Sequence, residues 1–176
     1  MLIVGENLEQ LNNQYHIVDS TNCYDRTCLK LRLDKKIITI EKTEEVLVYG
    51  EEIPPSYIKE DIIKDEGIII PPFSAILACS LETVNIPMGY YGFLQTKGTL
   101  ARFFVSIHFC DGQIDSGYKG KVTFEIFNGS PNKIKIHKNQ AVANLFIFNT
   151  SSKENLPYKG KYLNTDKPTL PREGVY

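Results

Sequence analysis

The chain has 176 residues, 42% of them hydrophobic and 23% charged, and its 20 lysines and arginines against 21 aspartates and glutamates leave a formal net charge of −1. This composition argues against disorder over most of the chain, and the length fits one domain. The balanced charge argues against a protein that coats nucleic acid or an anionic membrane through charge alone. The longest apolar run, Ile68–Cys79, is too short for a membrane helix and contains two prolines.

The N-terminal segment predicts one short helix. Leu8 and Leu11 have helical spacing beside Glu6 and Glu9. Because these acidic residues stand where a signal peptide would carry positive charge and then an apolar run, no export signal is expected. The protein is therefore expected in the cytoplasm. The dispersed cysteines predict neither a disulfide framework nor a zinc site, but buried or neutral thiols; they are Cys23, Cys28, Cys79 and Cys110.

From Cys28 to Phe148 the sequence predicts short strands, because β-branched and aromatic residues gather in runs separated by Gly, Pro and Asn. The expected strands are residues 28–33, 36–41, 46–49, 67–70, 75–81, 92–95, 103–109, 121–127, 133–137 and 141–148. Ten short strands at close spacing indicate an all-β sandwich or jelly roll. Residues 43–67 carry eight acidic and two basic residues, so this acidic excursion is expected at the surface.

Beyond Phe148 the periodicity ends, and prolines and glycines interrupt residues 150–176. We expect an irregular tail without a core of its own. Its composition favours disorder over a segment that folds onto a ligand. The alternation of Tyr158, Lys161 and Tyr162 would nevertheless suit a phosphorylated ligand.

The sequence lacks the motifs of several common classes of hydrolytic and nucleotide-processing enzymes. Zinc deaminases need His-x-Glu and Pro-Cys-x-x-Cys, and zinc hydrolases need His-Glu-x-x-His. P-loop enzymes need a Gly-x-x-x-x-Gly-Lys-Ser/Thr loop, and serine hydrolases usually need Gly-x-Ser-x-Gly. None of these patterns is present. These four classes of enzyme are therefore disfavoured.

Two loops and one strand contain residues that could bind a ligand or transfer a proton. Lys97-Gly98-Thr99 offers backbone N–H groups, a hydroxyl and a cation, which could cradle a phosphate outside a helix. In the loop after it, Asp115 could bind a sugar hydroxyl and Tyr118 could stack on a sugar or base. Taken alone, the first loop is a weak signal and the second would be a hairpin turn.

The strand over residues 121–127 alternates, so that Glu125 projects away from the apolar face. Glu125 is either a solvated strand residue or a partly desolvated carboxylate with a raised pKa that exchanges a proton with water. Arg102 similarly has an ordinary interpretation as a surface ion pair.

These residues in this order resemble the dCTP deaminase branch of the dUTPase-like family. The family pattern Arg-Ser-Ser-Leu-Ala-Arg corresponds to Lys97–Arg102, and Ile-Asp-Pro-Gly-Trp/Phe-x-Gly corresponds to Ile114–Gly120. Glu125 falls at the deaminases' catalytic glutamate, where simple dUTPases have an apolar residue. The segments 72–87 and 157–169 are similar to a family strand and to the deaminases' phosphate-covering lid.

The resemblance implies a distorted jelly-roll β-barrel of the dUTPase-like type with a short N-terminal helix and an irregular C-terminal tail. It implies a single domain over residues 1–176, divided into an N-terminal segment 1–27, a β-core 28–149 and a lid or tail 150–176. It also implies a homotrimer with its sites at the subunit contacts.

The implied activity is metal-independent hydrolytic deamination of dCTP to dUTP and ammonia, with Mg²⁺ bound only through the triphosphate and no zinc. Glu125 would be general base and acid, and Arg102 would orient it and stabilise charge. Substrate-binding roles are implied for Lys97, Gly98, Thr99, His108, Asp111, Asp115, Tyr118, Tyr158 and Lys161. Of these, Lys97 and Thr99 would hold the triphosphate, and the main chain around His108–Asp111 would read the cytosine edge. Asp115 would bind the 3′-hydroxyl, Tyr118 would pack on the deoxyribose, and Tyr158 and Lys161 would close on the phosphates.

Four positions depart from the family pattern. Gly98 replaces a serine that helps to hold the attacking water, and Lys97 replaces an arginine, with loss of bidentate geometry. Asp111 replaces a small neutral residue, and Lys30 replaces an aspartate. Two alternatives to the deaminase therefore stay open: a dUTP diphosphatase or bifunctional enzyme, and a catalytically inactive nucleotide-binding relative.

Overall fold

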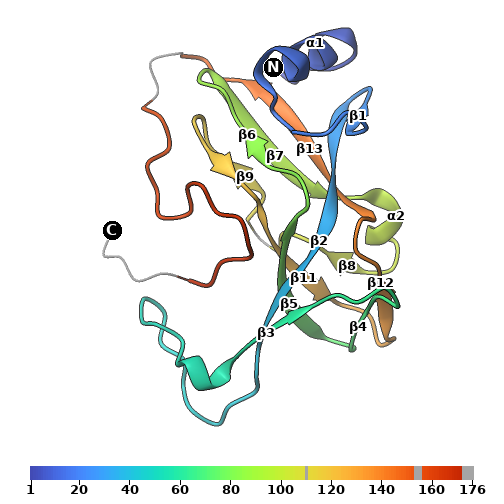
Figure 1. Ribbon diagram of the computed structural model, residues 1–176, viewed down its shortest axis with the longest axis vertical. Helices are drawn as coiled ribbons and strands as arrows, with labels where there is room; N and C mark the ends of the chain where they lie inside the picture. The colour runs from blue at the N-terminus through green and yellow to red at the C-terminus, as the bar shows by residue number, and fades with distance from the viewer. Residues whose placement is uncertain (110, 153–155, 172–176) are drawn as a thin grey trace.

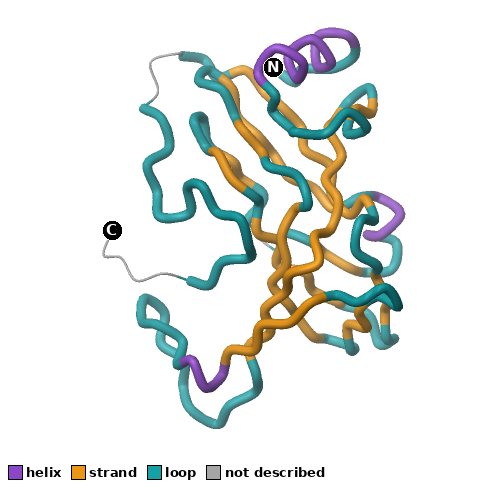
Figure 2. Tube along the Cα trace, viewed as in Figure 1, coloured by secondary structure: helices purple, strands orange, loops and turns teal. Residues whose placement is uncertain are grey.

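Antiparallel strands make up most of the regular structure in the computed structural model, which describes residues 1–109, 111–152 and 156–171 (Figure 1). The strands are β1 (Tyr24–Asp25), β2 (Cys28–Ile40), β3 (Ile58–Ile62), β4 (Ile68–Ile70), β5 (Ser74–Ser80), β6 (Val84–Asn85), β7 (Tyr90–Thr96), β8 (Val105–Ser106), β9 (Gln113–Ile114), β10 (Lys119–Gly120), β11 (Thr123–Asn128), β12 (Ile134–Ile136) and β13 (Ala141–Asn149). The helices are α1 (Glu6–Tyr15), α2 (Gly98–Ala101) and a 3₁₀ turn at Pro55–Tyr57. Figure 2 shows how loops connect these short elements.

One sheet of nine strands organises the fold. Its order is β8-β11-β5-β2-β13-β7-β9, and β1 and β3 also pair with β2. The long strand β2 pairs with β13 through Leu29–Arg32 and with β3 through Lys36–Ile40, and its pairing with β5 shifts register between Leu33 and Ile37. Such a bulge bends a strand, so β2 passes from one part of the curled sheet to another.

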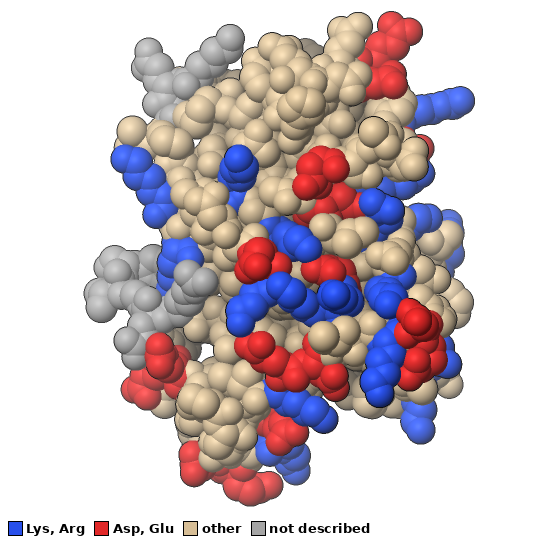
Figure 3. All heavy atoms as spheres, viewed as in Figure 1, with Lys and Arg blue, Asp and Glu red and all other residues tan. Residues whose placement is uncertain are grey.

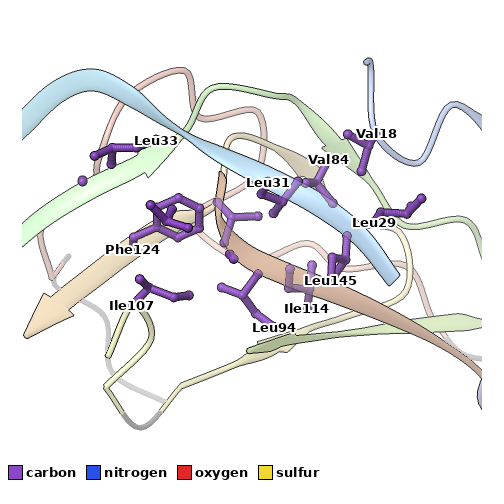
Figure 4. Close-up of a cluster of buried hydrophobic side chains, with 14 of the residues drawn as sticks. Val18, Leu29, Leu31, Leu33, Val84, Leu94, Ile107, Ile114, Phe124 and Leu145 are labelled. Carbon is purple, nitrogen blue, oxygen red and sulfur yellow. The ribbon is translucent and has the colours of Figure 1, made fainter. Parts of the chain in front are cut away.

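The core lies inside this curled sheet. Leu29, Leu31 and Leu33 of β2 alternate inward and are fully buried, as are Phe124 and Ile126 of β11. Figure 4 shows side chains from β2, β7, β11 and β13 meeting in this cluster. Since both neighbours of Glu125 on β11 point into the core, the period-two geometry of the strand directs Glu125 to the opposite face.

The expected all-β class and the short N-terminal helix are confirmed. The expected strands 28–33 and 36–41 form one continuous strand, β2, and residues 103–109 contribute only β8. The strand expected at residues 46–49 is wrong: these residues lie in a loop, and Val46 and Tyr49 are 87% and 89% exposed. Instead, the acidic excursion contains β3, which was not expected.

Residues 156–171 of the tail are irregular, as expected, but they pack along the β-core. The Tyr158 N–H donates to Ser116 O over 2.8 Å, the Asn164 N–H to Lys119 O over 2.6 Å, and the Lys121 N–H to Thr165 O over 2.8 Å. The disorder favoured by composition is therefore wrong for these residues. The tail beyond Pro171, and Cys110, lie outside the described residues.

Candidate active site

Glu125 stands at the middle of β11, half-buried on the face turned away from the core. Its strand neighbours are Leu77 of β5 and, through an isolated bridge, His108. Burial, and secondly the Asp111 carboxylate, raise the pKa of Glu125 from 4.5 to about 7. The geometry therefore favours the desolvated carboxylate over the solvated strand residue. A carboxyl group with this pKa can both accept and donate a proton near neutral pH.

The chain turns sharply beside Glu125. The Asp111 N–H donates to His108 O over 2.7 Å, and the Phe109 ring packs edge-on against Phe127 with centroids 5.2 Å apart. Within the described part of the chain, the buried Nδ1 of His108 has no hydrogen-bond partner. The turn therefore brings an acidic side chain and an available imidazole nitrogen to the vicinity of the carboxylate.

The loop between β9 and β10 places its polar residues differently. Asp115 is exposed, whereas Tyr118 is buried and donates its hydroxyl hydrogen to Lys121 O over 2.8 Å. The Tyr118 ring meets the Tyr158 ring of the tail at 60°, with centroids 5.7 Å apart. Burial first, and then the Asp115 and Asp111 carboxylates, raise the pKa of Tyr91, which places both acids near one tyrosine. The loop, the turn at Asp111 and the tail thus share one region.

The expected phosphate cradle is partly helical, which corrects its placement outside a helix. Gly98 and Thr99 form the start of α2, and Lys97 is its N-terminal flanking residue. The Lys97 Nζ donates to the Thr99 hydroxyl over 3.3 Å. Gly98 is exposed, and a Cβ added there would meet no atom within 4 Å.

Arg102 follows α2 and is exposed. It is not among the groups that shift the pKa of Glu125. Figure 1 shows α2 and the tail at opposite edges of the molecule, with β11 between them. One chain therefore brings Glu125, Asp111 and His108 together, but places α2 at the opposite edge of the molecule from the tail.

Metal-binding and thiol chemistry have little basis in the described residues. They contain no group of three or more His, Cys, Asp or Glu side chains that could hold a metal ion. Burial raises the pKa of Cys23, of Cys28 and of Cys79, the last to about 12. These three thiols stay neutral at physiological pH. The described residues also contain no helix long and apolar enough to cross a membrane.

Comparison with known proteins gives consistent matches. The family model described as dCTP deaminase-like matches residues 8–150. A dCTP deaminase of Staphylothermus marinus is 30% identical over 144 residues, which cover 81% of this chain and 80% of that protein. A "dCTP deaminase, dUMP-forming" of Methanospirillum hungatei is 28% identical over 133 residues, covering 70% of this chain and 71% of the relative.

A solved structure shares the fold. The crystal structure of 2′-deoxycytidine 5′-triphosphate deaminase from Agrobacterium tumefaciens superimposes with a TM-score of 0.63 at 12% sequence identity. The match covers 83% of this chain and 47% of that chain, so the present chain spans about half of the longer protein.

Proposed function

Because the chain belongs to the dCTP deaminase-like family, we propose that it is an enzyme that hydrolyses dCTP to dUTP and ammonia, without a metal at the reacting carbon. The observation that carries the mechanism is Glu125. It is a half-buried carboxyl group with a pKa of about 7, on the strand face opposite the core.

In this mechanism, Glu125 takes a proton from a water molecule as the oxygen attacks C4 of the cytosine ring. The protonated carboxyl group then returns that proton to the amino group, which leaves as ammonia while the C4–N bond breaks. The reaction consumes one water and yields dUTP. A pKa near the working pH suits both transfers, because neither protonation state is costly to reach. Arg102 would orient the carboxylate and stabilise negative charge near C4.

Substrate binding is divided among four segments, of which two bind the triphosphate and the sugar. Lys97 and Thr99 would hold the triphosphate, and Mg²⁺ would enter as part of the substrate, Mg–dCTP. Asp115 would bind the 3′-hydroxyl and Tyr118 would pack on the deoxyribose. Gly98 would stand beside the attacking water.

The remaining substrate contacts come from two further segments. The main chain from His108 to Asp111 would read the cytosine edge. Tyr158 and Lys161 of the tail would close on the phosphates.

We propose that the functional unit is a homotrimer with each site shared between subunits. The support is that Arg102 is not among the groups that shift the pKa of Glu125, and that α2, which follows Lys97, lies at the opposite edge of the molecule from the tail (Figure 1). A neighbouring copy would supply the missing half of each site. A deoxynucleoside triphosphate substrate and neutral, unbridged thiols are consistent with a cytoplasmic protein.

A bifunctional enzyme is the second candidate, because some relatives carry the name "dCTP deaminase, dUMP-forming". The experiment is to incubate the protein with dCTP and Mg²⁺ and to quantify ammonia, dUTP, dUMP and pyrophosphate. We expect ammonia and dUTP in equal amounts without pyrophosphate. Ammonia with equal dUMP and pyrophosphate would favour the bifunctional enzyme. Pyrophosphate from dUTP without ammonia from dCTP would favour a diphosphatase, and binding without turnover an inactive relative.

A further inference from the structure

A cavity of about 490 Å³ lies between α2 and the hairpin formed by β12 and β13. The α2 side contributes Lys97, Thr99, Leu100 and Phe103. The hairpin side contributes residues 133–136 and 140–142. The cavity therefore joins the proposed phosphate-binding residues to a segment more than 30 positions further along the chain, to which the sequence motifs assign no role.

The lining of this cavity carries charge of one sign. Lys97, Lys133 and Lys135 are among the lining residues, and none of the lining residues is acidic. Lys135 on β12 and Lys133 directly before that strand are both exposed, and both line the cavity. Within the residues that the structure describes, none of these three lysines forms an ion pair. Three ammonium groups around one cavity repel each other unless an anion lies among them.

Other lysines near this hairpin have partners. Lys138, in the turn between β12 and β13, pairs with Asp65 at 2.6 Å and does not line the cavity. A carboxylate from outside the hairpin, that of Asp65, therefore reaches Lys138, whereas no carboxylate lines the cavity. Leu100, Phe103 and Val142 form an apolar part of the wall.

We propose that Lys133 and Lys135 bind the triphosphate of the nucleotide together with Lys97 and Thr99. This inference rests on the proposed function, because a nucleoside triphosphate is the polyanion that such an enzyme takes. Lysine suits the role, since its ammonium is a compact charge on a flexible stem that can follow a mobile phosphate chain.

The test is the double variant Lys133→Gln/Lys135→Gln, which removes two charges from exposed positions and keeps the fold. We expect the KM for dCTP to rise about tenfold or more, since charge-assisted phosphate contacts are lost. The kcat should stay within about twofold of the parent, because neither residue approaches the reacting ring. Calorimetry with inorganic tripolyphosphate should show a matching loss of affinity. The matched control, Lys138→Gln, removes a charge from the same hairpin outside the cavity and should leave both values unchanged.

The outcomes separate this inference from the proposed function. A double variant with the parental KM for dCTP and the parental tripolyphosphate affinity would overturn the role of Lys133 and Lys135 and leave the deaminase assignment standing. If the parent does not deaminate dCTP, the proposed function fails, and loss of tripolyphosphate binding in the double variant alone would still support the polyanion site. A parent that binds no tripolyphosphate overturns the site.

Discussion

At the scale of single residues, Glu125 is an ionisable side chain that the strand holds half-buried, where its charged form is disfavoured. Phe124 and Ile126 anchor it between two core positions, so the side chain cannot turn away from its half-buried surroundings. Burial and Asp111 then raise its pKa to about 7. Because burial disfavours the charged form, an ionised Glu125 lowers the free energy of unfolding. Groups that destabilise the fold in this way are typical of functional positions.

The free energy of unfolding should therefore depend on pH through the ionisation of Glu125. Between about pH 4.5 and 7 the folded protein keeps a proton on Glu125 that the unfolded chain releases, so the free energy of unfolding falls as pH rises through this window. Glu125→Gln carries no charge and should therefore be more stable than the parent at pH 8, with the difference vanishing below pH 4.5. Urea unfolding midpoints across this range measure it. A variant that is less stable than the parent at pH 8 would contradict the raised pKa.

A second prediction for a single residue concerns Gly98, at the start of α2. A Cβ at this position meets no atom within 4 Å, so serine fits without strain. Serine also has a higher helix propensity than glycine in α2, by roughly 0.5 kcal/mol. We expect Gly98→Ser to be at least as stable as the parent and to deaminate dCTP at an equal or higher rate, because it adds a hydroxyl where the family pattern has one. Steady-state kinetics and a thermal melt measure both. A folded variant with a reduced kcat would show that a hydroxyl at this position does not assist the reaction.

At the scale of elements, the tail is held by a close backbone contact. Gly117 has φ of +83°, and a Cβ there would lie 2.8 Å from the Pro157 Cβ. Tyr158 then packs on Tyr118 at the edge of the core. The tail therefore depends on a glycine in the loop between β9 and β10.

Removing residues 157–176 should leave the β-core folded but weaken dCTP binding, because the core strands lie outside the deleted segment while Tyr158 and Lys161 are lost. Equilibrium binding of dCTP and urea unfolding measure the two effects. Gly117→Ala keeps every tail residue but displaces the tail, and should weaken binding in the same direction. Unchanged affinity and turnover in the truncated protein would show that the tail is not a lid.

The sequence could predict elements whose pattern is local. Period-two alternation was enough to identify the strand around Glu125 and the face on which it lies. The same reasoning failed at Val46–Tyr49, which has strand-forming residues but lies exposed in a loop. It left open whether Glu125 is solvated or has a raised pKa, because the shift depends first on burial and secondly on the Asp111 carboxylate, both set by the tertiary packing. Nor could it predict that Lys133 and Lys135 share a cavity with Lys97, because only the folded hairpin brings them together.

At the scale of the whole molecule, α2 with its neighbouring charged residues lies at the edge opposite the tail (Figure 1). Charged side chains of both signs are intermingled on the middle and lower parts of the face seen in Figure 3, in agreement with the net charge of −1. No single-sign field therefore steers the nucleotide to this face, and binding would depend on local clusters. A shared site would unite the carboxylate of one subunit with the arginine of another.

Mixing two inactive variants tests this division. Arg102→Ala and Glu125→Gln should each be inactive alone. Co-refolded in equal amounts, they should recover up to about a quarter of the parental activity, because random trimers contain some sites with both native residues. Sedimentation should give a trimer at micromolar concentration. A monomer of about 20 kDa, or a mixture that stays inactive, would contradict the shared site.

The most direct measurement of the central claim is the rate at which Glu125→Gln deaminates dCTP. Glutamine keeps the size and hydrogen-bonding capacity of the side chain but cannot accept a proton from water. General acid–base catalysis contributes about 10² to 10⁴ in rate, and a group that serves both proton transfers should reach the upper end. We predict a loss of this size in kcat with dCTP affinity retained, and no loss in Glu9→Gln, an exposed control on α1. A Glu125→Gln protein that deaminates dCTP at the parental rate would contradict the mechanism.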